Sequence, residues 1–195
     1  MRFPRGLLAV LLLSGASPPA DVGAVGETLN LARAIIRMAS TPTWTPRKFR
    51  GIAGEQHALG MSSMLREECA RAGLVPYLVA ALIQNESGWE GSTSGTRGEI
   101  GLMQVFPRGS RAWFRCTENA ATLTKDARAN VRCGLRELAH WRDACFGTDG
   151  LRWPGGYNVG SCSTETGARY ARRIWRIYDR AMQGLPEKLE SRRRR

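Results

Sequence analysis

Apolar residues recur every three or four positions along most of this chain, which is the spacing of one face of an α-helix. No stretch alternates apolar and polar residues as a half-buried strand does, and no internal repeat is present. With 43% hydrophobic and 24% charged residues, the chain is also too apolar for wholesale disorder. The sequence therefore predicts a mainly α fold, built as a single α-helical domain. The predicted helices cover 27–38, 61–72, 76–87, 126–142 and 164–182.

Segments rich in Gly, Pro, Ser and Thr separate these helices. Residues 40–56 contain Pro42, Pro46, Gly51 and Gly54, so we expect a loop or linker there. Two further glycine-rich segments are predicted to be long loops, at 88–101 and 147–161. Loops of this length inside a compact domain usually carry function.

The first residues have the features of a secretory signal. Two arginines precede a short apolar run, 7–13, and small residues follow, with cleavage predicted at 22–24 or alternatively near Ser17 or Ala20. The run is far shorter than the roughly 20 residues that a transmembrane helix needs. Ala16 stands where a lipoprotein signal would have cysteine. We therefore expect an exported protein, periplasmic or secreted, that is not a lipoprotein.

The predicted organisation has four parts. They are a signal peptide (1–24), an N-terminal helix and linker (25–60), the main helical domain (61–184) and a basic tail (185–195). The tail ends in four arginines, whose mutual repulsion favours a solvated, disordered end. Binding of the tail to anionic lipid, cell-wall polymer or nucleic acid is the alternative.

The chain has five cysteines, which allow two disulfides and one thiol in 5 × 3 = 15 ways. Export makes disulfides permissible. Cys116 and Cys133 are separated by 17 positions, and so are Cys145 and Cys162, which favours these two local pairs. Cys69 would then be a buried thiol in a helix. There is no Cys-x-x-Cys pair, and the two histidines show no metal-ligand spacing, so neither a metal nor another cofactor is expected.

One glutamate lies on the inward face of the predicted helix 76–87. Glu86 follows Val79, Leu82 and Ile83 by seven, four and three residues, so all four share one side. Burial disfavours the ionised carboxylate, and the negative end of the helix dipole lies close by, so both effects raise the pKa of Glu86. A carboxylic acid that keeps its proton near neutral pH can act as a general acid. The alternative is a carboxylate at a frayed helix end that reaches solvent or an arginine.

Five short segments follow one another in a distinctive order. They are Leu82-Ile83-Gln84-Asn85-Glu86-Ser87-Gly88-Trp89, Gly101-Leu102-Met103-Gln104 with Pro107, Asn130-Val131 with Gly134, Gly156-Tyr157-Asn158 with Gly160, and Glu165-Thr166 with Tyr170. Together they resemble the soluble lytic transglycosylase (SLT) family of lysozyme-like enzymes, over roughly residues 61–182. The resemblance implies a lysozyme-like α domain with long active-site loops. The last segment has one residue more than the family pattern, and Pro154-Gly155-Gly156 replaces small helix formers, which predicts a more flexible backbone before Tyr157.

The resemblance implies cleavage of the β-1,4 bond between N-acetylmuramic acid and N-acetylglucosamine in peptidoglycan. Glu86 would protonate the leaving oxygen and then act as base on the muramyl C6 hydroxyl, giving a 1,6-anhydro end. Ser87 would bond near the reacting sugar, Gln104 would contact its amide or hydroxyl groups, and Tyr157 would donate to Glu86 or to the N-acetyl group. Three further residues would form the walls of the cleft: Met103, Asn158 and Tyr170. Core packing is the alternative for Met103 and for Tyr170.

Two neighbouring acids decide between this reaction and hydrolysis of the same bond. Glu90 and Glu99 are expected to be solvated loop charges. If either faced the cleft, a muramidase with two carboxylates would be the alternative. A non-catalytic wall-binding protein on the same fold is a further alternative.

Sugars bind on aromatic faces, and the tryptophans nearest the motifs are candidate platforms. Trp89, Trp113 and Trp153 are the candidates, whereas Trp141 and Trp175 are expected to pack on helices.

The chain carries 29 Lys and Arg against 17 Asp and Glu, a net charge of +12, which suits an anionic partner. Peptidoglycan glycan strands with their peptide carboxylates fit this charge, and so do other anionic envelope polymers. An arginine stripe on the last helix, at Arg172, Arg173, Arg176 and Arg180, is expected to be a solvated face. No nucleic-acid partner is expected, and we expect a monomer.

Overall fold

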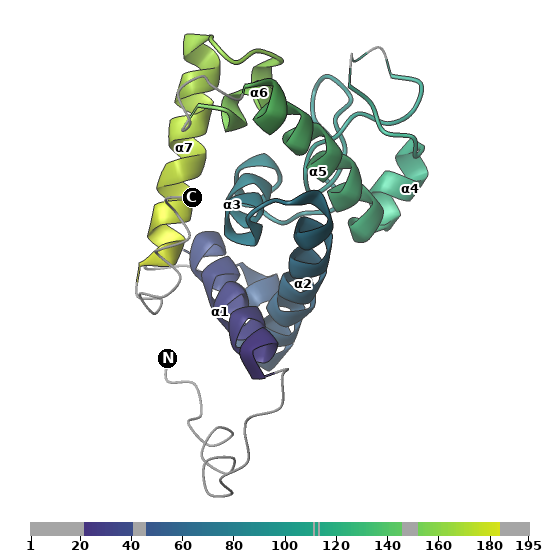
Figure 1. Cartoon of the computed structure of the whole chain (residues 1–195). Helices are drawn as coiled ribbons and strands as arrows, with labels where there is room; N and C mark the ends of the chain where they lie inside the picture. Colours follow the sequence, from purple (N-terminus) through teal and green to yellow (C-terminus); the bar gives the residue numbers. More distant parts are fainter. Residues whose placement is uncertain (1–21, 41–45, 111, 113, 146–151, 184–195) are drawn as a thin grey trace, which may run out of the picture.

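The helix α3 (Pro76–Glu86) lies at the centre of the fold, and the other long helices pack around it (Figure 1). The computed structural model describes residues 22–40, 46–110, 112, 114–145 and 152–183. Its other elements, in chain order, are α1 (Val22–Ala39), the 3₁₀ turn η2 (Arg47–Phe49), α2 (Gly51–Ala72), α4 (Ala120–Lys125), α5 (Ala127–Ala144), α6 (Pro154–Val159) and α7 (Glu165–Met182). The described residues form no strand, only isolated bridges in the loop after α3. The prediction of a mainly α fold is therefore confirmed.

Local sequence signals set the ends of several helices. Gly73 ends α2 in the left-handed conformation, with φ 63°, where a residue without a side chain is favoured. Pro76 occupies the first turn of α3, where its missing N–H is not needed. Asp126 begins α5 by accepting two backbone N–H bonds, and Thr164 begins α7 by accepting one from Gly167.

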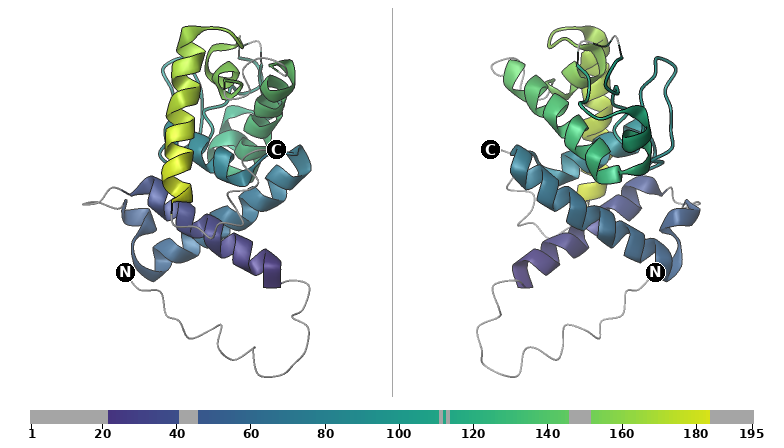
Figure 2. Two further views of the ribbon diagram at one scale, coloured as in Figure 1. Left: turned by 60° about the vertical axis from the view of Figure 1, so that its left-hand side comes forward. Right: turned by 90° about the vertical axis from the view of Figure 1, so that its right-hand side faces the viewer.

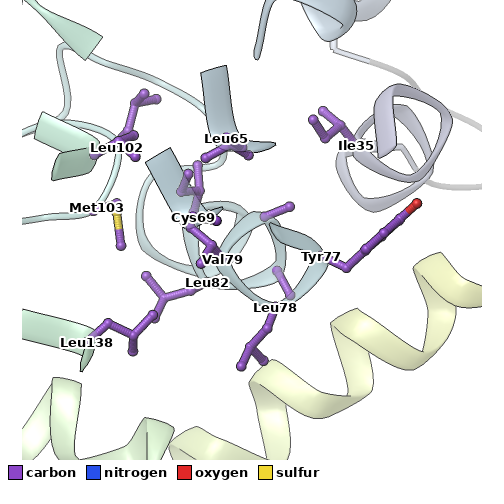
Figure 3. Packing of buried hydrophobic residues seen from close by; sticks show 14 of the residues in the cluster. Ile35, Leu65, Cys69, Tyr77, Leu78, Val79, Leu82, Leu102, Met103 and Leu138 are labelled. Atoms are coloured by element: carbon purple, nitrogen blue, oxygen red, sulfur yellow. The ribbon is translucent and has the colours of Figure 1, made fainter. Parts of the chain in front are cut away.

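The apolar character of α3 on all sides explains its central position. Its residues from Tyr77 to Ile83 are all buried, as expected for a helix enclosed by others. Figure 3 shows Leu82 extending toward Leu138 of α5 and Leu78 toward α7. Both Leu82 and Leu138 are 0% exposed. Below this core α1 crosses α2, and both contact α3 (Figure 2). Because Glu86 is the last residue of α3, the core fixes its position.

Three parts of the secondary-structure prediction are corrected. Helix α2 begins at Gly51 and not at 61, so the predicted linker 40–56 is partly helical. Gly54 does not break this helix. It allows the 3₁₀ turn to fold back closely, since a Cβ there would lie 2.2 Å from the carbonyl carbon of Phe49. The short helices α4 and α6 were not predicted, and α6 lies inside the predicted loop 147–161.

Some predictions concern residues near the two ends of the chain, which lie outside the described residues. This holds for positions 1–21 of the predicted signal and for the basic tail, 185–195. Residues 22–24 form the first turn of α1. None of the helices described is long and apolar enough to cross a membrane.

Both predicted disulfides are present. Cys116–Cys133 fastens the segment before α4 to α5, and Cys145–Cys162 fastens the end of α5 to the connection between α6 and α7. Each closes a loop with a sequence separation of 17, which stabilises the fold by about 3 kcal/mol. Cys69 is a buried free thiol, as predicted, and burial raises its pKa to about 12, so it is unreactive.

A buried carboxylate joins α2 to α5. Glu68, with only 3% of its side chain exposed, accepts from Arg132 Nε at 2.8 Å, Arg128 Nη1 at 2.6 Å and Arg71 Nη1 at 2.7 Å. The bond from Arg132 is the largest cause that lowers the pKa of Glu68 from 4.5 to about 2. A carboxyl whose pKa is lower in the folded than in the unfolded protein stabilises the fold at pH values above its unfolded-state pKa. This contribution is lost as the pH falls through the folded-state pKa.

Glu68→Gln is expected to lower the free energy of unfolding by about 2 kcal/mol at pH 7, a figure reduced because solvent screens the half-exposed arginines. The difference from wild type should shrink between about pH 5 and pH 2 and vanish below that. Urea unfolding at a series of pH values measures it. Glu165→Gln, which removes an exposed pair with Arg172, is the control and should leave the urea midpoint unchanged. If Glu68→Gln were still less stable than wild type at pH 2, the stabilising role of the ionised Glu68 would be contradicted.

Candidate active site

A cleft of about 790 Å³ opens beside the C-terminal end of α3. Its walls come from the loop after α3, from α5, from α6 and from the start of α7. The lining residues are Glu86, Gly95, Thr96, Arg97, Glu99, Gln104, Phe106, Ala112, Phe114, Glu137, Tyr157, Asn158, Val159, Gly160 and Thr166. The cleft is therefore formed by segments far apart in the sequence that meet around one glutamate.

Glu86 is held by two side chains that donate to the same carboxylate oxygen. The hydroxyl of Tyr170 donates to Oε1, and Asn85 Nδ2 donates to it at 3.1 Å. Burial raises the pKa of Glu86 above 4.5, whereas these two hydrogen bonds and the charge of Arg173 lower it by less. The raised pKa that was predicted from the position of Glu86 on the inward face of its helix is thus confirmed in direction. Desolvation is its main cause. The group keeps its proton to a higher pH than an ordinary glutamate does.

Another wall of the cleft is formed by residues 94–106, here named the cleft loop, which α5 holds in place through one amide. Asn130, only 1% exposed, accepts from the Met103 N–H at 2.9 Å and donates to the carbonyls of Ile100 at 2.8 Å and Leu123 at 3.2 Å. Gly134, one turn further, leaves room for Met103, since a Cβ there would lie 2.7 Å from the Cβ of Met103. The two motif segments therefore fit together as one unit.

The loop is itself closed by short backbone bridges. Ile100 pairs with both Ser94 and Val105, and Gln104 adopts a positive φ of 50° between them. Its side-chain Nε2 donates to the carbonyls of Gly101 at 2.8 Å and Thr93 at 3.1 Å. The amide nitrogen of Gln104 therefore stabilises the loop, and its side chain lines the cleft.

Four of the seven predicted site residues line the cleft together: Glu86, Gln104, Tyr157 and Asn158. The other three lie behind its surface. Tyr170 is buried against Glu86. Ser87 donates at 2.8 Å to the carbonyl of Leu102, so it fastens the loop to the end of α3.

Two detailed contacts differ from prediction. Met103 is 0% exposed and packs in the core (Figure 3), so core packing, the alternative, is correct for it. The hydroxyl of Tyr157 donates to the Met103 carbonyl at 2.7 Å and not to Glu86. It is Tyr170 that bonds Glu86. The acceptor of the Tyr157 bond is a backbone carbonyl of the loop, whose position the sequence does not predict.

The glycines before Tyr157 are sites of close packing. A Cβ on Gly155 would lie 2.3 Å from the carbonyl oxygen of Gly167, and one on Gly156 would lie 2.5 Å from the ring of Trp141. These contacts bring α6 against α5 and α7. Residues 154–159 are helical, and Tyr157 is buried. The prediction of a loop before Tyr157 is therefore wrong, since the segment is helical.

The two acids singled out from the sequence differ in their surroundings. Glu90 lies outside the cleft, where it pairs with Lys48 at 3.2 Å with 58% of its side chain exposed, as predicted for a loop charge. Glu99 is buried in the cleft wall, so the same prediction is wrong for it. Both of its oxygens are bonded by Arg97, through Nε at 2.7 Å and the backbone N–H at 3.0 Å.

A third acid in the cleft was missed. Glu137 of α5 lines the cleft and is only 7% exposed. Burial is the largest cause that raises its pKa to about 8, the negative charge of Glu86 raises it further, and an interaction with Trp141 lowers it. The sequence carried a signal for it, since Glu137 lies one turn from Gly134 and from Trp141 on the inward side of the helix.

Among the described residues, the aromatic side chains that line the cleft are those of Phe106, Phe114 and Tyr157. Trp89, predicted as a sugar platform, is 3% exposed and packs edge-on against Phe49 with ring centroids 6.0 Å apart. Trp153 is half-buried at the start of α6, and Trp113 lies outside the described residues. Trp141 and Trp175 pack on helices as predicted.

Metal-ligand types gather at one place among the described residues, formed by Cys116, Glu118 and Cys133. Both sulfurs are joined in the disulfide, so they are not available as thiolate ligands. This group is therefore structural.

The profile of the transglycosylase SLT domain matches residues 63–175, more than half of the chain. The match spans α3, the cleft loop, α5, α6 and part of α7. The chain belongs to the transglycosylase SLT family. At family level this supports a lytic-transglycosylase type of action on peptidoglycan, and it confirms the resemblance and the all-α class. A comparison with curated proteins finds no match. The two disulfides fit a place outside the reducing cytoplasm.

Proposed function

We propose that this SLT-family protein is an exported lytic transglycosylase that cleaves the β-1,4 bond between N-acetylmuramic acid and N-acetylglucosamine and leaves a 1,6-anhydromuramyl end. The observation that carries the proposal is the position of Glu86. It lines a cleft large enough for sugar rings, its pKa is raised by burial, and Glu86-Ser87 resembles the Glu-Ser pair that ends a helix in the family. The net charge of +12 favours binding to the anionic wall.

In this mechanism Glu86 acts twice. Its carboxylic acid first gives a proton to the leaving glycosidic oxygen, and the substrate's own N-acetyl group stabilises the oxocarbenium ion. The resulting carboxylate then removes the proton of the muramyl C6 hydroxyl, whose oxygen bonds to the anomeric carbon. One proton leaves Glu86 and one returns, so no water is consumed. Tyr170 and Asn85, which bond Oε1, orient the carboxyl for both steps.

Hydrolysis of the same bond is the second candidate, because Glu99 faces the cleft. Two-carboxylate glycosidases need a second acid that is free to act as base or nucleophile. Both oxygens of Glu99 are bonded by Arg97, and Glu137, with a pKa of about 8, keeps its proton at neutral pH. These features favour the single-acid reaction.

The test is the chemistry of the new chain end. Purified sacculi are digested with the mature protein, and the released muropeptides are analysed by mass spectrometry. Anhydromuropeptides are expected. Reducing-end muropeptides would identify a muramidase instead and direct attention to Glu99. Wall binding without any release would support the non-catalytic alternative.

Tyr170→Phe is expected to shift the alkaline limb of the pH–rate profile upward by about one pH unit. The hydroxyl bond stabilises the ionised form of Glu86, so its loss raises the pKa of Glu86 and extends the pH range of the acid form. Initial rates on sacculi between pH 4 and pH 9 measure this. Tyr178→Phe, on the same helix but away from the cleft, should leave the limb in place. A downward shift of the alkaline limb in Tyr170→Phe would contradict the role of Tyr170 in stabilising the ionised form of Glu86.

A further inference from the structure

Glu137 is a buried carboxyl that the proposed mechanism leaves unused. In the described part of the chain, the structure pairs it with no Lys or Arg. The other two buried carboxyls near α5 differ, since Glu68 has three arginines and Glu99 has Arg97. A buried carboxyl without a cation is stable only in its neutral form, and that form carries a proton to donate.

The groups that face Glu137 come from three helices. Glu86 of α3 acts on it through its negative charge, and Trp141 of α5 through its indole. Tyr157 of α6 is near both carboxyls, because the charges of Glu137 and Glu86 each raise its pKa after the larger effect of burial. Tyr170 and Arg173 of α7 also act on Glu86. The two carboxyls therefore belong to one electrostatic unit in the lining of the cleft.

Among the described residues, no hydrogen bond carries the proton of Glu137 to a protein acceptor. The Tyr157 hydroxyl already donates to the Met103 carbonyl, and the oxygen Oε1 of Glu86 already accepts from Tyr170 and Asn85. The carboxyl of Glu137 lines the cleft. A donor that points into a cleft without a protein acceptor is available for a ligand.

We propose that Glu137, in its neutral form, contacts the substrate and donates a hydrogen bond to an acceptor oxygen of the sugar bound beside Glu86. The strongest neutral acceptor on an N-acetylated sugar is its acetamido carbonyl, so the residue selects acetylated glycan. This inference rests on the proposed function only for the identity of the ligand. It makes Glu137 a specificity-determining residue of the cleft.

The affinity of the cleft for the sugar should depend on pH through Glu137. When Glu137 loses its proton, the donor becomes a charged acceptor that repels the carbonyl oxygen. Binding should therefore weaken as pH rises through its pKa, which is about 8 while Glu86 is ionised. Removing the charge of Glu86 should move this loss to lower pH, because that charge raises the pKa of Glu137.

The experiment measures binding without turnover, in the Glu86→Gln background. The probe is soluble uncrosslinked glycan strands, prepared from sacculi with an amidase, and titration calorimetry gives the Kd at pH 5 and pH 9. Four proteins are compared: Glu86→Gln alone and in combination with Glu137→Gln, Glu137→Leu or Asp143→Asn. Asp143 is an exposed carboxylate on the same helix and serves as the matched control.

At pH 5, Glu137→Leu should weaken binding about tenfold, whereas Glu137→Gln, which still has an N–H to donate, should stay within about threefold. Between pH 5 and pH 9 the affinity of the parent and of the Asp143→Asn control should fall, and that of the Glu137→Gln variant should not. Circular dichroism melts show that all four proteins are folded.

Three results would overturn the inference. They are unchanged binding by the Glu137→Leu variant, a pH effect that persists in the Glu137→Gln variant, and no binding of acetylated strands by the parent. Failure of the proposed function is separate, since the wild-type digest reports it. Wild-type cleavage together with unaltered binding by Glu137→Leu would reject this inference alone. The expected binding pattern without wild-type cleavage would reject only the proposed reaction.

Discussion

Glu86→Gln is expected to lower the release of muropeptides from sacculi on the order of a thousandfold, while affinity for the wall stays within about twofold. The carboxamide has no proton acidic enough for the leaving oxygen and is no base for the C6 hydroxyl. Its oxygen still accepts from Tyr170 and Asn85, so the geometry of the cleft should be preserved. The loss therefore falls on the reaction and not on folding or binding.

Release rates come from chromatography of soluble products, and wall affinity comes from co-sedimentation with sacculi. Glu90→Gln is the matched control, because it makes the same chemical change four residues away at an exposed side chain paired with Lys48. Its release rate should stay within about twofold of wild type. A Glu86→Gln protein that kept a tenth of the activity would place the general acid elsewhere. An equal loss in both variants would point to general damage to the loop.

The features that sequence reasoning placed correctly are local or depend on one helix. The helical period alone puts Glu86 on the side of Val79, Leu82 and Ile83, and all three are fully buried. Once Glu86 faces inward, desolvation follows and raises its pKa. Equal spacing favoured the two disulfide pairs because short loops bring their ends together readily.

The features that were missed depend on how distant segments meet. Tyr157 bonds Met103 and Tyr170 bonds Glu86, and nothing within either segment distinguishes these partners. The glycines of residues 154–156 looked like a loop because propensity treats glycine as a helix breaker, whereas contacts with α5 and α7 require it. Helical periodicity could have placed Glu137 on an inward face, as it did Glu86. Its importance, however, depends on the cleft that α5 and α3 line together.

Asn130 holds the cleft loop, and its removal should have the largest effect on stability. Asn130→Ala is expected to lower the free energy of unfolding by about 3 kcal/mol, because it leaves the buried Met103 N–H and the carbonyls of Ile100 and Leu123 without this partner. The loop carries Gln104, so muropeptide release should also fall, by about tenfold or more.

Asn130→Asp separates the lost hydrogen bonds from the lost volume. The aspartate keeps an oxygen that accepts from the Met103 N–H, but its second oxygen faces the carbonyls of Ile100 and Leu123, which repel it. At pH 7 this nearly isosteric variant should therefore be at least as unstable as Asn130→Ala, and urea unfolding compares the two. Asn119→Ala removes the exposed cap of α4 and should cost only about 1 kcal/mol without loss of activity. If Asn130→Asp were as stable as wild type, the amide donor would not hold the loop, and the Asn130-Val131 segment would act through packing alone.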